Sequence, residues 1–330
     1  MNSPSAPNAS ERPVSPTQSG QPPQPVRPVR LVGVGHVALD HYFEVDSLPV
    51  AATKVAARSY RCLVGGMTAN ALVAAARLGA QAFMVAPVAE DEALGIFRAH
   101  FQTEGIDASG LKCVPGARHS VSMILVDAHG ERTIVSHRSD AGRLAGPFDT
   151  ACLDAADVLL TDPRFVDWAQ SALEAARARR LLSILDADVA PSEDLRRLVG
   201  LAEWAVFSEP GLLAYSAMGD LPGERLQQIQ AGLMQALQAG AQVAVVTLGA
   251  RGLMWQRRGE ALRSMPAHPV DAVVDTTAAG DVFHGALGVA LASGGSDQEA
   301  LAWAARAAAL KCRHAGGVLG APWARDMSDV

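Results

Sequence analysis

Residues 274–281 read VDTTAAGD, and the stretch VFHGALGVALA follows them directly. We expect a strand to end near Asp275, a tight turn of small residues to follow, and an amphipathic helix to begin near Asp281. The amides of residues 278–281 would then point outward at the helix N-terminus, where the helix dipole favours bound anions. At that point Asp281 is placed to take a proton from an attacking hydroxyl. The alternative is that Asp275 or Asp281 only caps the helix.

Short apolar runs alternate with alanine-rich stretches of helical periodicity from Val29 onward. The runs that resemble buried strands are 30–35, 81–85, 158–161, 181–186, 204–208 and 243–248. The stretches that resemble helices are 68–78, 94–103, 168–179, 195–201 and 224–238. Such an alternation forms βαβ units, so the sequence predicts an α/β fold whose mostly parallel sheet is covered on both faces.

Two β-like segments, His41–Leu63 and Ser120–Ser136, have no partner helix. We expect them to pair as a small sheet that forms a lid over a crevice at the carboxyl ends of the parallel strands. Residues 1–29 hold 8 of the 19 prolines and few apolar groups, which predicts a disordered tail. The predicted division is a tail over 1–29, a core over 30–44, 64–118 and 138–325, and a lid over 45–63 and 119–137.

Composition excludes several classes of protein. The formal charge of −6 argues against a protein that coats nucleic acid or anionic lipid. No apolar run reaches the ~18 residues of a membrane helix, and residues 1–30 lack the apolar core of a signal peptide. The cysteines lie far apart, without the spacing of a zinc site, so we expect free thiols and a cytoplasmic protein. They are Cys62, Cys113, Cys152 and Cys312.

The string DTTAAGD resembles the DTxGAGD signature of the ribokinase-like (PfkB) carbohydrate kinases, with Ala278 where most members have glycine. The resemblance extends over about residues 30–325. It implies a three-layer α/β/α core with a small β-sheet lid. It also implies that Asp281 is the catalytic base and that the amides of Ala278, Ala279 and Gly280 line an anion hole.

Two further motifs resemble the sugar site of the family. In Gly65-Gly66-Met67-Thr68-Ala69-Asn70 the glycines let a helix begin close to a ligand, and the Asn70 amide both donates and accepts hydrogen bonds. The resemblance implies that Gly65, Gly66 and Asn70, with Asp40, hold sugar hydroxyls. Met67 stands where ribokinases have lysine. Seen alone, the glycine pair equally fits an ordinary turn.

Residues 33–38 also fit the dinucleotide fingerprint GxGxxA. That motif requires a helix directly afterwards, whereas residues 40–45 resemble a strand. The pattern therefore does not favour a dehydrogenase.

Two segments resemble the nucleotide site of the family. In VVTLGARG, residues 245–252, the resemblance implies that Thr247, Gly249 and Gly252 contact ATP. Residues 309–317, ALKCRHAGG, resemble the segment that closes over the adenine and, in some members, binds a monovalent cation such as K⁺. We expect Gly317 to contact that region. Lys311, Arg313 and His314 are interpreted as a solvated face.

The family's NxxE motif is altered here, because Ser208 replaces its asparagine and Gly211 its glutamate. Glu209 is the remaining candidate to orient water on Mg²⁺, which kinases use to neutralise phosphate charge. A GxxxxGK[ST] string is absent from the sequence, which argues against a P-loop kinase.

The strings FSEPGL, DVFHGALGVALA and ALKCRHAGG resemble the branch that contains kinases of 6-deoxy-6-sulfofructose. That resemblance implies that Lys54 and Arg164 hold the sulfonate, although Ser136 replaces an asparagine of the branch. The equally weighted alternative is that Lys54 and Arg164 are ordinary exposed charges. A neutral-sugar kinase (fructokinase, ketohexokinase or ribokinase-like) and a catalytically silent sugar- or nucleotide-binding module remain alternatives.

We therefore predict a kinase that transfers the γ-phosphate of ATP to a primary hydroxyl of a ketose-type sugar. Its expected partners are the sugar and ATP, without nucleic acid or membrane. The exposed β face of the lid also predicts a homodimer, because open sheet faces and edges are usually covered.

Overall fold

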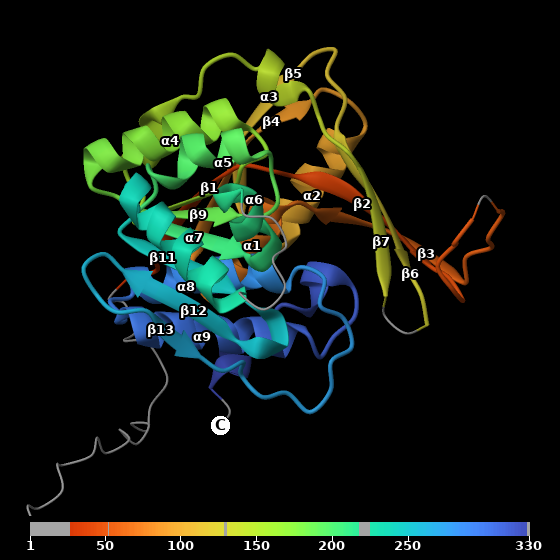
Figure 1. Cartoon of the computed structure of the whole chain (residues 1–330). Helices are drawn as coiled ribbons and strands as arrows, with labels where there is room; N and C mark the ends of the chain where they lie inside the picture. The colour runs from red at the N-terminus through yellow and green to blue at the C-terminus, as the bar shows by residue number, and fades with distance from the viewer. Residues whose placement is uncertain (1–26, 52, 129–130, 218–224, 329–330) are drawn as a thin grey trace, which may run out of the picture.

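The computed structural model describes residues 27–51, 53–128, 131–217 and 225–328. Within them a main sheet of nine strands has the order β13-β12-β11-β10-β9-β8-β1-β4-β5 (Figure 1). Its strands are β1 (Arg30–Val34), β4 (Gln81–Ala89), β5 (Asp107–Val114), β8 (Val158–Thr161), β9 (Leu182–Ala187), β10 (Trp204–Ser208), β11 (Val243–Thr247), β12 (Leu253–Arg257) and β13 (Arg263–Met265). The strands from β5 to β11 are parallel, while β12 and β13 add an antiparallel edge.

Helices cover both faces of this sheet, as the sequence predicts. Helices α1 (Met67–Arg77), α2 (Ala93–Thr103), α8 (Ala279–Ala292) and α9 (Asp297–Lys311) share one core. The other core holds α3 (Ala141–Leu144), α4 (Val166–Arg179), α5 (Ser192–Val199), α6 (Glu209–Ser216) and α7 (Arg225–Ala239). In β1, Leu31 faces the first core, whereas Val32 and Val34 face the second. Each such buried side chain contributes about 1.5–3 kcal/mol, which is why these strands are apolar throughout.

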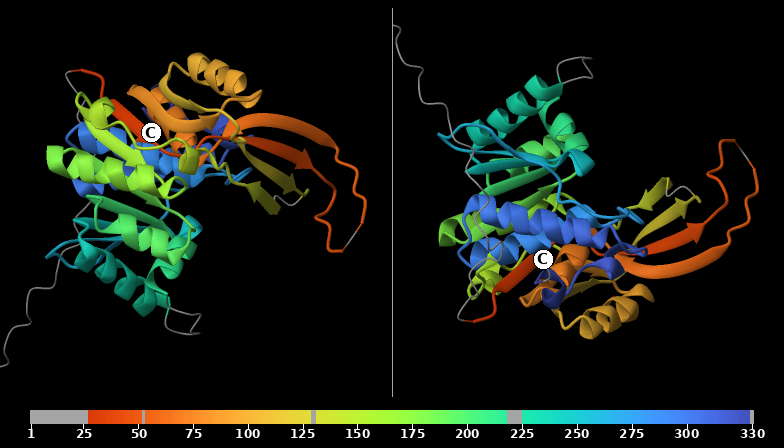
Figure 2. Two further views of the ribbon diagram at one scale, coloured as in Figure 1. Left: turned by 90° about the horizontal axis from the view of Figure 1, so that it is seen from above. Right: turned by 90° about the horizontal axis from the view of Figure 1, so that it is seen from below.

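A second sheet, with the order β3-β2-β6-β7, projects from one side of the main body (Figures 1 and 2). Its strands are β2 (Ala38–Glu44), β3 (Ser59–Gly65), β6 (Ser120–Val126) and β7 (Arg132–His137). Strand β2 pairs with β3 antiparallel and with β6 in parallel, so the predicted pairing of the two β-like segments is confirmed. The predicted boundary was wrong, because residues 38–44 belong to this small sheet and not to the core.

The turn at 274–281 differs from the prediction in two respects. Residues 271–278 are not a strand: the amides of Val274 and Asp275 bond to the carbonyl of Cys312, at 2.7 and 3.2 Å. Helix α8 begins at Ala279, two residues before Asp281, because Ala278 adopts a left-handed conformation with φ of 63°. The turn is therefore held by the segment after α9 and not by a sheet.

The predicted boundary of the N-terminal tail needs one correction. Residues 1–26 of the predicted tail lie outside the described residues, but residues 27–29 are part of the fold. Val29 is buried and its carbonyl accepts the amide of Gln81 at 2.8 Å, while Arg27 pairs with Asp157 at 2.6 Å.

Short 3₁₀ turns occur at Thr150–Leu153, Gly249–Arg251, Gly317–Gly320 and Ala324–Met327. In the described part of the chain, none of the helices combines the length and apolarity that crossing a membrane requires.

Candidate functional site

A cavity of 240 Å³ lies between the small sheet and the carboxyl ends of β1 and β8. It brings together six of the predicted site residues, Asp40, Gly66, Asn70, Arg164, Ala278 and Asp281. The remaining lining residues are His36, Met67, Ser122, Ile124, Ile134, Ser136, His137, Arg138 and Thr277. Asp40, Ser122 and Ser136 are register partners on adjacent strands, so they share the face of the small sheet that is turned to the cavity.

The first part of the site is the contact between α1 and α8. Asn70 Nδ2 donates a hydrogen bond of 2.7 Å to Asp281 Oδ2. The two helices approach closely because Gly285 has no side chain, and a Cβ there would collide with the carbonyl of Ala71. The packing of α1 on α8 therefore fixes Asp281 at the cavity wall, with part of its carboxyl group exposed to the cavity.

The surroundings of Asp281 make it a strong base. Removal from water raises the pKa of Asp281 well above its usual value, the negative charge of Asp186 raises it further, and the Asn70 hydrogen bond opposes this rise. Asp186, the penultimate residue of β9, is buried and has a raised pKa for the same reason, with the charge of Asp188 adding to it. A carboxylate with a raised pKa holds an accepted proton more tightly, which suits general base catalysis.

His284 lies one helical turn after Asp281, and sequence analysis missed it. Its Nδ1 lies 2.7 Å from the carbonyl of Gly280 and 3.5 Å from Asp186 Oδ2. Burial lowers the pKa of His284, so the neutral ring with Nδ1–H donates to that carbonyl. Because the Gly280 carbonyl and the Asp281 amide belong to one peptide plane, this bond orients the Asp281 amide.

The turn at 275–281 is held by Asp275. Its carboxylate accepts the amide of Thr277 at 2.8 Å and the amides of Gly316 and Gly317, both at 3.0 Å. The amide of Ala279, which is predicted to line an anion hole, bonds to the Thr276 carbonyl at 3.2 Å within the turn. The amides of Ala278, Gly280 and Asp281 are those left to meet a phosphate.

Asp40 and the glycine pair form the opposite wall. Burial raises the pKa of Asp40 to about 6, although a hydrogen bond with Ser122 opposes the rise. A Cβ at Gly65 would collide with the Asp40 carboxylate, and Gly66 has φ of 106°, which favours glycine. The pair is therefore more than an ordinary turn, since it leaves room for the Asp40 side chain and lets α1 begin beside the cavity.

Asp162, which sequence analysis also missed, ties these segments together. It is fully buried just after β8 and accepts hydrogen bonds from the amide of His36 (2.7 Å), the hydroxyl of Thr68 (2.5 Å) and the amide of Arg164 (2.9 Å). The only signal for Asp162 in the sequence is its place after a buried strand.

Among the described residues, the buried Nε2 of His36 has no hydrogen-bond partner. A buried polar atom at a cavity wall favours a ligand hydroxyl opposite it.

The predicted pair of Lys54 and Arg164 is not brought together. Lys54 is exposed in the loop between β2 and β3 and does not line the cavity. Arg138, which is exposed, lines the cavity instead; its partial burial lowers its pKa, and the nearby positive charge of Arg164 lowers it further. The Arg164 guanidinium donates to the Val189 carbonyl at 3.1 Å. Arg138 and Arg164 therefore line the same cavity, close enough for the charge of Arg164 to act on Arg138.

The predicted nucleotide contacts lie outside this cavity. Thr247 ends β11, where its hydroxyl donates to the Phe207 carbonyl at 3.3 Å. Gly249 and Gly252 have φ of 57° and 86°, so the turn after β11 needs glycine at both places. Gly317 is joined to the turn at 275–281, because its amide bonds to the Asp275 carboxylate.

Glu209 does not fit the predicted metal role. Its two carboxylate oxygens are held by Arg225, at 2.8 Å, and by Arg251. Burial would raise the pKa of Glu209, but these arginine hydrogen bonds outweigh it and lower the pKa. Within the described residues, no cluster of three or more His, Cys, Asp and Glu side chains could hold a metal.

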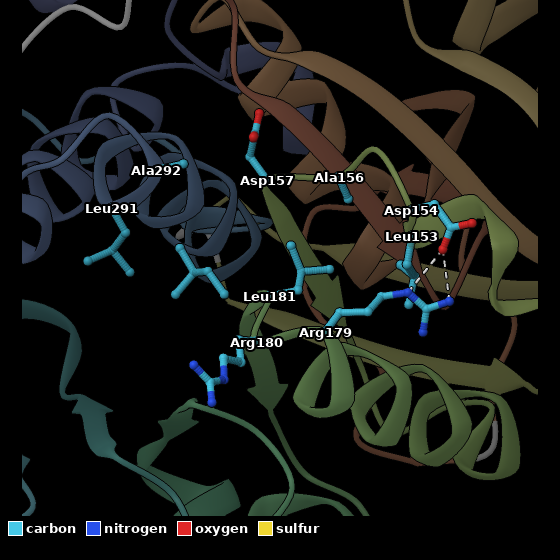
Figure 3. Close-up of a pocket in the computed structure, with 10 residues that line it drawn as sticks. Leu153, Asp154, Ala156, Asp157, Arg179, Arg180, Leu181, Leu291 and Ala292 are labelled. Atoms are coloured by element: carbon cyan, nitrogen blue, oxygen red, sulfur yellow. Dashed lines mark hydrogen bonds and ion pairs between the residues drawn. The ribbon is translucent and has the colours of Figure 1, made fainter.

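A wider cavity of 800 Å³ lies at the opposite end of the parallel strands, around the amino ends of β8 and β9 (Figure 3). It is lined by leucines and by charged groups such as Asp154, which bonds to Arg179 at 2.8 Å. It contains none of the predicted site residues, so the chemistry is placed in the smaller cavity.

Known proteins resemble this chain along most of its length. A family model described as "pfkB family carbohydrate kinase" matches residues 30–324. A ribokinase of Haemophilus influenzae is 27% identical over 85% of this chain and 91% of that protein. A ribokinase of Arabidopsis thaliana is 24% identical over 88% of this chain and 78% of that protein.

Solved structures show the same fold. A provisionally assigned ribokinase from Agrobacterium tumefaciens superimposes with a TM-score of 0.83 at 31% identity, covering 91% of this chain and 96% of that one. The Arabidopsis thaliana ribokinase complexed with ribose and ATP gives a TM-score of 0.79 at 23% identity, covering 91% and 97%. The chain therefore belongs to the pfkB family of carbohydrate kinases, and it is a phosphotransferase that acts on a sugar hydroxyl with ATP as the donor.

Proposed function

We propose that this kinase phosphorylates a primary hydroxyl of a ketose-type sugar that carries an anionic group, 6-deoxy-6-sulfofructose being the leading candidate. The observation that carries the kinase chemistry is the Asn70–Asp281 contact at the wall of a small polar cavity, directly beside the turn at 275–281. The observation that carries the anionic substrate is the pair Arg138 and Arg164 in that cavity.

In the proposed step, the sugar hydroxyl gives its proton to Asp281 as its oxygen attacks the γ-phosphorus of ATP. The new O–P bond forms, the bond to the β-phosphate oxygen breaks, and ADP leaves. The amides of Ala278, Gly280 and Asp281 would stabilise the charge on the transferred phosphoryl oxygens. Asp40 and the unpartnered His36 Nε2 would hold the other hydroxyls.

Mg²⁺ would enter with ATP. Kinases commonly hold Mg²⁺ through one or two carboxylates together with substrate phosphates, and not by a complete protein cage. Asp186 and Asp188, whose charges both act on Asp281, fit that pattern better than Glu209 does. The ion would neutralise phosphate charge there.

The two arginines support an anionic substituent for a physical reason. Placing two guanidinium groups in one cavity is unfavourable unless an anion binds them, and a sulfonate or phosphate accepts several such hydrogen bonds. Arg164 keeps the role that the sequence predicts, and Arg138 replaces Lys54.

A neutral sugar is the second candidate, because the named relatives include ribokinases and deoxyribokinases. Met67, at the start of α1 in the cavity wall, is what argues against ribose here. A catalytically silent binding module would bind the same ligands but release no ADP.

The outer face of the small sheet supports the proposed homodimer. His41, Phe43, Tyr60, Met123 and Val135 alternate with the residues that face the cavity, and the Tyr60, Met123 and Val135 side chains are exposed. Covering this apolar face with a second copy removes it from water. Light scattering would show a dimer, and Met123→Glu should yield monomers.

The substrate proposal is tested by ADP release from ATP and Mg²⁺ with sulfofructose, fructose, fructose phosphates, tagatose phosphate and ribose. We expect an anionic ketose to be preferred, and Arg138→Ala or Arg164→Ala to lower its kcat/KM by about tenfold to hundredfold, since each removes a charge-assisted hydrogen bond. Arg143→Ala, which removes an exposed arginine of α3, is the matched control. Preference for a neutral sugar, with both variants unchanged, would contradict the anionic-substrate proposal.

A further inference from the structure

Lys311 is a charged residue whose burial the sequence does not predict. The sequence places it on a solvated face, but the structure buries it completely at the end of α9, with a relative exposure of 0%. An ammonium group is hardly ever buried without a partner, because leaving water is costly. The neighbouring Arg313 and His314 are exposed, as predicted.

The partner of Lys311 is Asp275, the first residue of the turn at 275–281. Lys311 Nζ donates to the backbone carbonyl of Asp275 at 2.6 Å and lies 3.3 Å from its Oδ2. The same Oδ2 accepts the amides of Gly316 and Gly317. One buried ammonium thus contacts both kinds of oxygen on Asp275, while the carboxylate joins the turn to the segment after α9.

These contacts decide whether a monovalent cation fits here. A K⁺ ion would need the carbonyl and carboxylate oxygens of this segment, and those of Asp275 already face the ammonium of Lys311. A second positive charge in the same buried space would be repelled. A further cation, Arg132, donates to Thr276 Oγ1 at 2.7 Å from the small sheet. The residues present therefore do not fit a monovalent cation at Asp275.

We propose that the ammonium of Lys311 is a built-in cation that replaces a bound monovalent ion, so that this kinase works without K⁺. By holding Asp275, Lys311 keeps the turn at 275–281 in the shape that presents its amides to phosphate. Lys311 is a positioning residue in this account, because it touches Asp275 and not the reacting atoms. The inference rests on the proposed role of the turn in phosphate binding.

The first test measures turnover and the KM for ATP of the full chain in KCl and in choline chloride at equal ionic strength. We expect the wild type to be indifferent to the exchange. Lys311→Ala should lose about tenfold to hundredfold in kcat, because the turn is no longer held in its phosphate-binding shape. KCl or NH₄Cl, but not choline chloride, should restore part of that loss by filling the vacated space.

Arg313→Ala is the matched control, since it removes an exposed positive charge two residues away and should change nothing. A readout independent of turnover is the melting temperature: KCl should raise it in Lys311→Ala relative to choline chloride and leave the wild type unchanged. Calorimetric binding of ADP should weaken in Lys311→Ala and recover with KCl. These two readouts distinguish failure of this inference from failure to find the right sugar.

The inference is wrong if wild-type turnover requires K⁺, or if Lys311→Ala keeps full activity and ADP affinity. Loss of function in Lys311→Ala that no cation restores would also overturn it, because that result indicates a packing role alone. If Lys311→Ala does not fold, the response of the wild type to K⁺ decides the question.

Discussion

Replacing Asn70 by alanine tests the reasoning about the catalytic base. Asn70 Nδ2 donates its 2.7 Å hydrogen bond to Asp281, and only the ionised carboxylate gains fully from it. Removing the bond therefore raises the pKa of Asp281 further, in the direction in which burial and Asp186 already act. Because the base must be ionised to accept a proton, Asn70→Ala should lose activity at higher pH than the wild type.

The size of the effect follows from the strength of such a bond. Hydrogen bonds to charged groups contribute about 1.5–3 kcal/mol, and 1.36 kcal/mol corresponds to one pH unit, so the acid limb should move up by about 1–2 units. Asp40, with its pKa raised to about 6, would give a separate limb that this substitution leaves in place.

The assay is the pH dependence of kcat and kcat/KM from about pH 5 to pH 9, with Met67→Leu as the control. Met67 lies on the same helix and the same cavity wall but has no polar atom for Asp281. An acid limb that stays in place in Asn70→Ala, while turnover at its optimum is kept, would refute the assignment of Asp281 as the base.

Three further predictions concern neighbouring groups. Asp281→Asn should bind ATP and sugar but turn over about 10²–10⁴-fold more slowly, the usual contribution of a general base; near-normal rates in the ADP-release assay would remove Asp281 from that role. Asp162→Ala should lower the free energy of unfolding by about 3–5 kcal/mol in urea titrations, because it leaves three donors without a partner at about 1–3 kcal/mol each, whereas exposed Asp46→Ala should change little. Burial raises the pKa of Asp275, but the bonds from Gly317 and Thr277 outweigh it and bring it to about 2. The stability from this lowered pKa is therefore complete above about pH 4 and is lost toward pH 2; Asp275→Asn should flatten that part of the stability–pH profile, and an unchanged slope would exclude the contribution.

Much of the fold could be predicted because it depends on local pattern. The buried strands and the alanine-rich helices follow from period and composition, and the pairing of the two β-like segments follows from their lack of partner helices. The prediction began the small sheet at residue 45, whereas it begins with β2 at Ala38. Since β2 follows β1 after only three residues, the sequence alone does not show that the chain passes from one sheet to the other there.

The site was predicted where chemistry sits in a short motif and missed where it depends on distant contacts. Asp281, Asn70 and Asp40 come from contiguous strings, and the structure places them around one cavity. Asp162, Lys311 and Arg138 act through residues far away in the sequence, so no local pattern distinguishes them from ordinary charges. Glu209 was predicted to act at the metal from its local string. Its carboxylate is instead held by two arginines that lie 16 and 42 residues away, which the local string does not show.

The hydrogen bond from Arg132 to Thr276 has a consequence for binding affinity, because it joins the proposed binding regions of the two substrates. Arg132 belongs to β7, whose sheet borders the proposed sugar cavity, and Thr276 belongs to the turn that we propose meets phosphate. Because this bond already holds Arg132 on the turn, a sugar that stabilises the small sheet in this position should also stabilise the turn in the shape that ATP would meet. Coupling between two binding sites is reciprocal, so ATP must tighten the sugar by the same factor by which the sugar tightens ATP. The affinity of either ligand, measured alone, will then understate its affinity in the ternary complex.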